Sequence, residues 1–115
     1  MPVTLVSDPA QRVEIARAIL SQLPEWFGIP AATEGYITDA AHEPCFVCEK
    51  DGAPVGFLCL KETGRSTVEL AVMGVLKPCH RKGYGRALVD AAVAYARQTG
   101  YEFMQVKTCL LYTSP

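Results

Sequence analysis

A turn rich in glycine and basic side chains joins a strand-like run to a helix-like run in the second half of the chain. The residues from Val68 to Val75 are mostly apolar or β-branched, as in a buried strand, and apolar residues recur at helical spacing from about Tyr84 to Arg97. The glycines and basic residues between these runs are Lys77, His80, Arg81, Lys82, Gly83, Gly85 and Arg86. Backbone N–H groups at a helix N-terminus lack partners and bind anions, above all phosphate. The pattern therefore predicts a phosphate-binding turn.

Size and charge indicate one small domain without a strongly charged surface. A chain of 115 residues is long enough for one hydrophobic core. The formal net charge is −1, so we expect no general attraction to nucleic acid or to an acidic membrane. The basic residues near position 80 are therefore a local feature of one site.

The cysteines predict free thiols and no metal centre. An odd number of cysteines without an export signal favours a reducing, cytoplasmic location. Cys45 and Cys48 have the spacing of half a zinc site, but no second pair follows, and residues three apart on a strand point to opposite faces. We therefore expect structural thiols at Cys45, Cys48, Cys59, Cys79 and Cys109. No apolar run approaches the roughly 20 residues of a membrane-spanning helix.

The hydrophobic periodicity predicts an α/β domain with elements in the order β-α-α-β-β-β-α-β. Asp8 followed by Pro9 is typical of a helix start, and the apolar spacing extends that helix to about Leu23, before Pro24. The segment 50–52 is typical of a hairpin turn. The other expected elements are strands over 2–6, 45–49, 55–61, 67–75 and 103–107, and helices over 31–41 and 84–98. The last strand is expected to be parallel to the strand before the phosphate-binding turn.

An aromatic pair, Trp26 and Phe27, lies in the loop between the two N-terminal helices. Next to a loop glycine, these rings could line a substrate pocket. The alternative is a hydrophobic lid over the core. The sequence leaves both interpretations open.

The phosphate-binding turn resembles the cofactor motif of the GNAT superfamily of acetyl-CoA-dependent N-acetyltransferases. The family pattern Gln/Arg-x-x-Gly-x-Gly/Ala falls on His80-Arg81-Lys82-Gly83-Tyr84-Gly85, with His80 in the Gln/Arg place. The resemblance covers residues 3 to about 107 and is most specific from Val72 to Leu88. It implies the GNAT fold, a mixed and mostly antiparallel sheet flanked by helices, here without the C-terminal strands of the family. A P-loop or a dinucleotide-binding fingerprint does not match the turn.

The resemblance implies acetyl-CoA as the co-substrate, with no metal. The N–H groups from about Arg81 to Arg86 would hold the pyrophosphate, and small residues would let the backbone approach it closely. The strand before the turn would pair with the pantetheine arm, with a β-bulge at Gly74, and one of its N–H groups would polarise the thioester carbonyl. The residues implied in cofactor binding are Met73, Gly74, Val75, His80, Arg81, Lys82, Gly83, Tyr84, Gly85 and Arg86.

Glu69 is the candidate general base, because it is the only carboxylate in an otherwise apolar strand. It precedes Gly83 by the same distance as the catalytic glutamate in the histone-modifying branch of the family. Burial would raise its pKa and suit it to take a proton from an ammonium group. The alternative is a Glu69 that faces solvent at a sheet edge. A covalent mechanism through Cys79 is not expected, because His80 is the one base beside it in the sequence.

The expected function is the transfer of acetyl from acetyl-CoA to a primary amine of a small molecule or peptide, by direct attack in a ternary complex. The alternative is a non-catalytic acyl-CoA-binding module on the same fold. Nucleic-acid binding is disfavoured, because aromatic and basic residues do not alternate and the net charge is near zero. No membrane partner is expected, and a homodimer is an option.

The last seven residues, 109–115, resemble the translation of a transposase adapter used in sequencing libraries. We therefore predict a partial GNAT domain over 1–108 and a non-native tail over 109–115. An ordinary apolar extension is the alternative. In the family the general acid is often a tyrosine beyond the next strand, and the resemblance places it in the part that this chain lacks. Tyr112 is not assigned this role, because it belongs to the predicted tail. The chain as it stands is expected to be marginal or inactive.

Overall fold

The structure, a computed structural model, describes residues 3–22, 30–79 and 81–106. Its sheet has five strands in the order β1-β2-β3-β4-β5, and neighbouring strands are antiparallel except for the parallel pair β4 and β5. The elements are β1 (Val3–Val6), α1 (Pro9–Leu20), α2 (Pro30–Ala40), β2 (Cys45–Lys50), β3 (Ala53–Glu62), β4 (Thr67–Val75), a 3-10 turn η1 (Lys77–Cys79), α3 (Tyr84–Gln98) and β5 (Phe103–Val106). The predicted order of strands and helices, and the parallel last strand, are confirmed.

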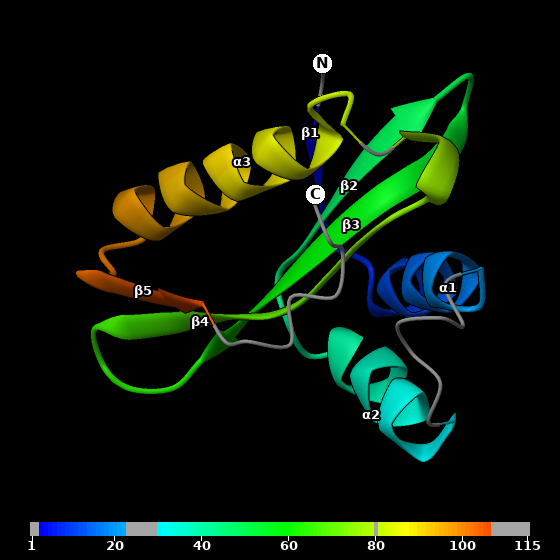
Figure 1. Cartoon of the computed structure of the whole chain (residues 1–115). Helices are drawn as coiled ribbons and strands as arrows, with labels where there is room; N and C mark the ends of the chain where they lie inside the picture. Colours follow the sequence, from blue (N-terminus) through cyan, green and yellow to red (C-terminus); the bar gives the residue numbers. More distant parts are fainter. Residues whose placement is uncertain (1–2, 23–29, 80, 107–115) are drawn as a thin grey trace.

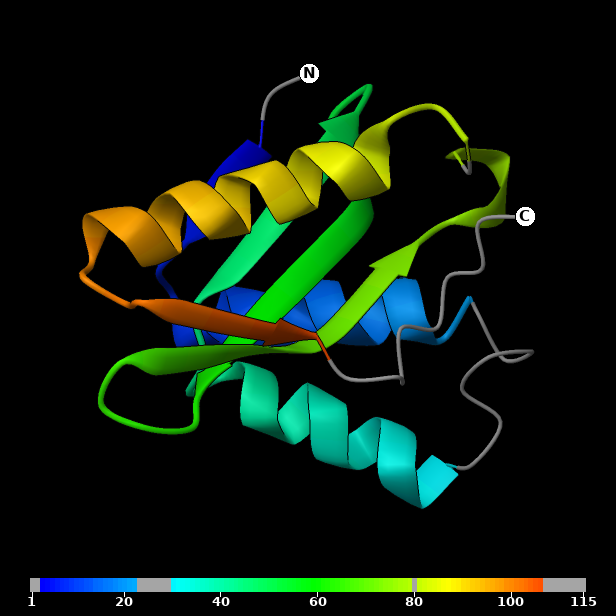
Figure 2. The same cartoon turned by 60° about the vertical axis from the view of Figure 1, so that its left-hand side comes forward.

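Helices cover both faces of the sheet, with α3 on one face and α1 and α2 on the other (Figures 1 and 2). Each face has its own hydrophobic core. The strand cysteines divide between the cores as expected: Cys48 packs on the α3 side and Cys45 on the α1 and α2 side. The four cysteines in the described part of the chain are buried free thiols, and Cys109 lies outside it. None of the described helices combines the length and apolar character needed to cross a membrane.

The helix start at Asp8 is confirmed, whereas the predicted end of that helix is wrong. The Asp8 carboxylate accepts a hydrogen bond from the Ala10 N–H at 3.2 Å, with Pro9 in the first helical position. α1 ends at Leu20 and not near Leu23. The N–H of Gln22 bonds to the carbonyl of Ile19, three residues back, so the chain leaves α-helical geometry before Pro24. Pro24 itself lies outside the described residues.

The hairpin between β2 and β3 forms at the predicted turn. Asp51 and Gly52 have φ values of 54° and 80°, and Lys50 pairs with Ala53 across the turn. Two successive left-handed residues are typical of a tight two-residue hairpin, for which Asp-Gly is a preferred sequence.

The predicted β-bulge at Gly74 is wrong. Gly74 pairs regularly with Phe57 of β3, and the register shifts instead where Cys59 pairs with Val72 and Leu60 with Leu70. The extra residue is therefore Ala71 of β4. A bulge accommodates one additional residue on one strand and does not require glycine.

Helix α3 packs on the sheet through a stripe of buried small and apolar residues. Gly85, Leu88, Ala92 and Ala96 recur at helical spacing and are buried. Leu88 lies directly over Gly56 of β3, where an added Cβ would be 3.2 Å from Leu88 Cδ1. The missing side chain at position 56 thus brings the helix close to the sheet.

Replacing Leu88 by alanine should lower the free energy of unfolding by about 2–5 kcal/mol, because the fully buried side chain would leave a cavity between α3 and β3. Denaturant unfolding followed by circular dichroism measures this loss. Asp90→Ala on the exposed side of the same helix is the control and should change the value by less than about 0.5 kcal/mol. A similar effect of both substitutions would contradict the packing described for α3.

Candidate functional site

The turn between β4 and α3 has the backbone geometry of an anion-binding site. Gly83 is the N-cap of α3 with φ of 87°, and Arg81 also has a left-handed φ of 63°. No side chain of the described residues caps the helix, and the first described backbone bond inside it runs from the Ala87 N–H to the Gly83 carbonyl at 3.0 Å. The N–H groups of the first helical turn therefore lack a side-chain cap among the described residues and lie at the positive end of the helix dipole.

Basic side chains surround this turn at the surface. Arg81, Lys82 and Arg86 are exposed, and Arg86 makes only a long ion pair of 3.9 Å with Asp90, at the surface of the helix. Such a pair contributes little to stability, so the guanidinium can move to another anion at low cost. Gly85 is buried, Tyr84 is half-buried, and His80 lies outside the described residues.

The last residues of β4 are buried, and the sheet continues on one side of them. Met73, Gly74 and Val75 pair with Leu58, Phe57 and Gly56 of β3. On the other side, the described pairing with β5 ends at Leu70 opposite Val106. Within the described part of the chain, β4 therefore extends beyond its last pair with the parallel edge strand β5.

Glu69 is buried and does not face solvent from a sheet edge. Its exposed fraction is 4%, and its neighbours in register are Lys61 on β3 and Gln105 on β5. The adjacent Val68 and Leu70 belong to the core on the α3 side, so Glu69 points to the opposite face, toward α1 and α2. It lies at the level where the described pairing of β4 with β5 ends.

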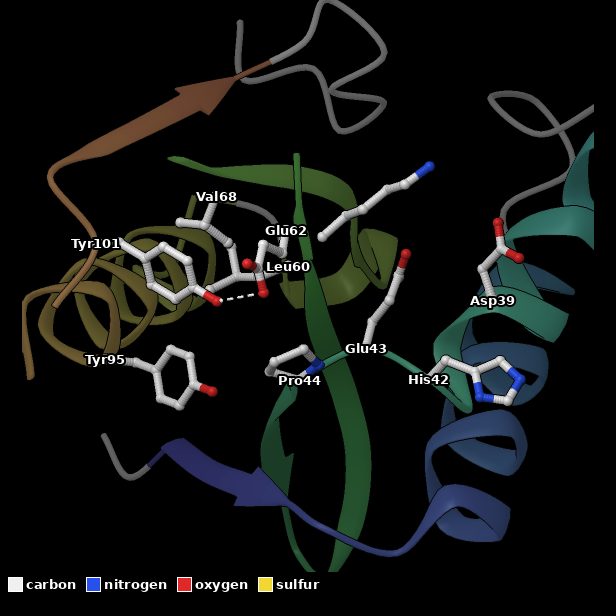
Figure 3. A pocket seen from close by; sticks show the side chains of 10 residues that line it. Asp39, His42, Glu43, Pro44, Leu60, Glu62, Val68, Tyr95 and Tyr101 are labelled. Atoms are coloured by element: carbon white, nitrogen blue, oxygen red, sulfur yellow. Dashed lines mark hydrogen bonds between the residues drawn. The ribbon is translucent and has the colours of Figure 1, made fainter. Parts of the chain in front are cut away.

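A pocket of about 530 Å³ lies at the end of β3, next to the position of Glu69. Its lining includes charged, aromatic and apolar side chains, which are Asp39, His42, Glu43, Pro44, Leu60, Lys61, Glu62, Val68, Tyr95 and Tyr101. Figure 3 shows Asp39, His42 and Glu43 together on one side of the pocket and Tyr95, Tyr101 and Glu62 together on the other. The Tyr101 hydroxyl donates a hydrogen bond of 3.1 Å to the Glu62 carboxylate. We call this cavity the Glu43 pocket.

Glu43 is the most perturbed carboxyl group of the pocket. Its exposed fraction is 7%, and its pKa is raised from 4.5 to about 7. Burial is the main cause, and the negative charges of Asp39 and then Glu69 act in the same direction, against the positive charge of Lys61. Glu43 can therefore gain or lose a proton near neutral pH.

A match to a family model covers residues 10–111 and carries the description acetyltransferase (GNAT) family. The chain belongs to this family. No curated protein sequence matches the chain.

Solved structures of GNAT-like proteins share the fold at low sequence identity. An IAA acetyltransferase from Bacillus cereus ATCC 14579 superposes with a TM-score of 0.71 and 20% identity over 91% of this chain and 63% of its own. A ribosomal-protein-alanine N-acetyltransferase from Brucella melitensis biovar Abortus 2308 has a TM-score of 0.72 and 14% identity over 93% and 79%. The aminoglycoside N-acetyltransferase AAC(6')-Iy in complex with CoA has a TM-score of 0.69 and 19% identity over 99% and 77%. The chain thus spans 63% of the first of these relatives.

Several residues singled out in the GNAT motif and around it lie outside the described part of the chain. They are His80 of the turn, Trp26 and Phe27 of the aromatic loop, and the segment 109–115. The roles proposed for the aromatic pair and the division of the chain at residue 108 stay predictions.

Cys79 is buried at the end of η1. Burial raises the pKa of the Cys48 and Cys59 thiols. The Cys48 and Cys59 thiols therefore stay protonated and unreactive.

The sequence interpretation missed Glu43 altogether. The residue lies in a short connection between α2 and β2, where a charged side chain is expected to be solvated. Its burial arises because β3 continues beyond the start of β2, so that the α2–β2 connection covers the end of β3: the Pro44 carbonyl accepts from the Leu60 N–H at 3.0 Å. The one local signal is a carboxylate two residues before a buried strand, and that signal is weak.

Replacing Glu43 by glutamine should stabilise the protein at high pH and not at low pH. Because folding raises the pKa of Glu43, the folded state favours the protonated carboxyl, and its stability falls as pH rises from 4.5 to about 7. The variant lacks this loss and should gain up to about 3 kcal/mol over the wild type at pH 8, with little difference at pH 4. Denaturant unfolding at the two pH values measures the gain. Glu14→Gln, at an exposed position of α1, is the control, and an equal response of both variants would contradict the assignment.

Proposed function

We propose that this chain binds acetyl-CoA at the turn between β4 and α3 and transfers the acetyl group to a primary amine. The observation that carries the proposal is the left-handed Gly83 at the uncapped N-terminus of α3, surrounded by exposed basic side chains, in a chain of the acetyltransferase (GNAT) family. A conformation with φ of 87° strains any residue with a Cβ, whereas glycine adopts it without cost. The turn therefore fits a pyrophosphate that approaches the backbone closely.

The chain would hold the co-substrate along the end of β4 and the start of α3. N–H groups from about Arg81 to Arg86 would bind the phosphates, with Arg81, Lys82 and Arg86 supplying charge. The backbone of Met73, Gly74 and Val75 would pair with the pantetheine arm as an additional strand does. When bound, acetyl-CoA supplies the thioester whose acetyl group is transferred. One solved structure of similar fold is AAC(6')-Iy in complex with the bisubstrate analogue CoA-S-monomethyl-acetylneamine.

Glu69 would act as the general base for the acceptor. An amine is mostly protonated near neutral pH and becomes a nucleophile only after it loses a proton. Glu69 is buried at the level where the described pairing of β4 with β5 ends, on the same strand as the residues proposed to hold the pantetheine arm. A buried carboxylate there could accept the proton directly before the attack of the amine on the thioester, so no covalent enzyme intermediate is needed.

Replacing Gly83 by valine should weaken acetyl-CoA binding at least tenfold, because a β-branched residue strains at this φ and pushes the backbone away from the phosphates. Isothermal titration calorimetry measures the affinity. Gly100→Val is a matched control, since Gly100 has φ of 91° at the other end of α3, where nothing lies within 4 Å of an added Cβ. It should lower stability to a similar extent and leave the affinity unchanged. Equal affinities of Gly83→Val and wild type would exclude this turn as the cofactor site.

Replacing Glu69 by glutamine should lower kcat by about 10²–10⁴-fold, the contribution of general-base catalysis, and leave the affinity for acetyl-CoA within about twofold of the wild type. Acetyl transfer to an amine is followed by thiol release, and the affinity by calorimetry. Glu49→Gln, at an exposed position of β2, is the control and should keep full activity. Acetyl-CoA binding without turnover in the wild type would instead identify the chain as a non-catalytic acyl-CoA-binding module.

A further inference from the structure

Glu43 is a buried carboxyl group without a partner for its side chain among the described residues. Its exposed fraction is 7%, and no hydrogen bond or ion pair joins its carboxylate to another described residue. Its backbone N–H bonds to the Ala40 carbonyl at 3.3 Å, which holds the residue at the end of α2. The side chain lines the Glu43 pocket (Figure 3). Burial of a carboxylate is costly unless a positive group compensates it, so this arrangement points to a cationic ligand.

The charge of the pocket favours a cation and excludes an anion. Three carboxyl groups line it, from Asp39, Glu43 and Glu62, against one lysine, Lys61. The Lys61 ammonium makes no ion pair with these groups among the described residues, although its charge acts on Glu43. Glu69 adds a further negative charge beside the pocket. The net charge around the pocket is thus negative.

The arrangement of these groups suits an organic cation better than a metal ion. Within the described residues, no three histidine, cysteine, aspartate or glutamate side chains converge as a metal ion requires. The acidic groups instead lie apart, with Asp39 and Glu43 on one side of the pocket and Glu62 on the other (Figure 3). Apolar lining from Pro44, Leu60 and Val68, with the rings of Tyr95 and Tyr101, can cover methylene groups between two charges.

We propose that the Glu43 pocket binds the second ammonium group of the acetyl acceptor, so that the acceptor is an amine with at least two positive charges. Glu43 is the counter-ion, and Asp39 and Glu62 contribute to the acidic field. The inference rests on the proposed function in one respect, which is that Glu69, beside the pocket, takes the proton of the reacting amine. Binding of the cation by Glu43 is testable without acetyl transfer.

The two carboxylates have different parts in this scheme. One ammonium group stays charged at Glu43, and the other gives a proton to Glu69. The nitrogen then forms a bond to the acetyl carbon while the carbon–sulfur bond breaks, and the second proton lost by the nitrogen passes to the leaving sulfur. The products are an N-acetylated amine that keeps one positive charge, free CoA thiol and the proton on Glu69.

The test compares 1,4-diaminobutane with n-butylamine, which has the same carbon chain and one charge. Calorimetry without acetyl-CoA should show at least tenfold tighter binding of the diamine to the wild type, and this preference should disappear in Glu43→Gln. Glu14→Gln, on the exposed side of α1, should keep it. Lys61→Met should tighten binding of the diamine, because a competing positive charge is removed. The fold of Glu43→Gln is checked by its melting temperature.

The pH dependence of binding separates Glu43 from the other titratable groups of the pocket. A cation prefers the ionised carboxylate, and a pKa of about 7 leaves roughly a tenth of Glu43 ionised at pH 6 and nine-tenths at pH 8. Diamine affinity of the wild type should therefore rise about tenfold over this range. The Glu43→Gln variant keeps the other charged and titratable groups around the pocket, which are Asp39, His42, Lys61 and Glu69. Any part of the rise in diamine affinity that this variant loses therefore belongs to Glu43.

The outcomes distinguish this inference from the proposed function. Diamine binding that depends on Glu43, together with acetylation of the diamine, supports both. Binding that depends on Glu43 without any acetyl transfer supports the cation site and overturns the proposed function. Acetylation of n-butylamine and the diamine at equal kcat/KM, unchanged in Glu43→Gln, supports the proposed function and overturns the inference. Absence of diamine binding to the wild type also overturns it.

Discussion

The contact between α3 and β3 at Gly56 is the constraint on which the candidate cofactor site depends. A helix can approach a sheet this closely only where the strand has no side chain, and Leu88 occupies that space. The stripe of Leu88, Ala92 and Ala96 then sets the rotation of the helix about its own axis. Since β4 runs beside β3, the same contact places the N-terminus of α3 beyond the end of β4. The candidate anion-binding turn is therefore positioned by the packing of α3 on β3 and not by its own basic residues.

The bulge at Ala71 has a comparable role for the candidate base. Without an extra residue, positions 68, 70 and 72 of β4 would share one face of the sheet. In the structure Leu70 packs on the α3 side and Val72 on the α1 and α2 side. Because the bulge resets the alternation, Met73 and Val75 return to the α3 side. Glu69 thus faces α1 and α2, while the end of the same strand presents apolar side chains to α3.

Local patterns predicted the elements well because their causes are local. The cap at Asp8, the Asp51-Gly52 turn and the stripe of α3 depend on residues close in sequence, and all three are confirmed. The bulge was assigned to Gly74 because glycine is its usual sign, yet it depends on the pairing of β3 with β4 and falls at Ala71. The burial of Glu43 likewise depends on how far β3 extends beyond β2, which no residue near position 43 encodes.

The pKa of Glu43 depends on burial and on the charged groups around it. The charge of Glu69 raises the pKa of Glu43, after the larger effect of burial and that of Asp39. Both negative charges oppose the ionised form of Glu43. An ammonium ion beside Glu43 offsets that mutual repulsion, whereas a neutral ligand leaves it in place. If the Glu43 pocket holds an ammonium group as proposed, acceptors would be distinguished by charge before any contact at the reacting nitrogen contributes, and the preference for a dication would follow from electrostatics and not from shape.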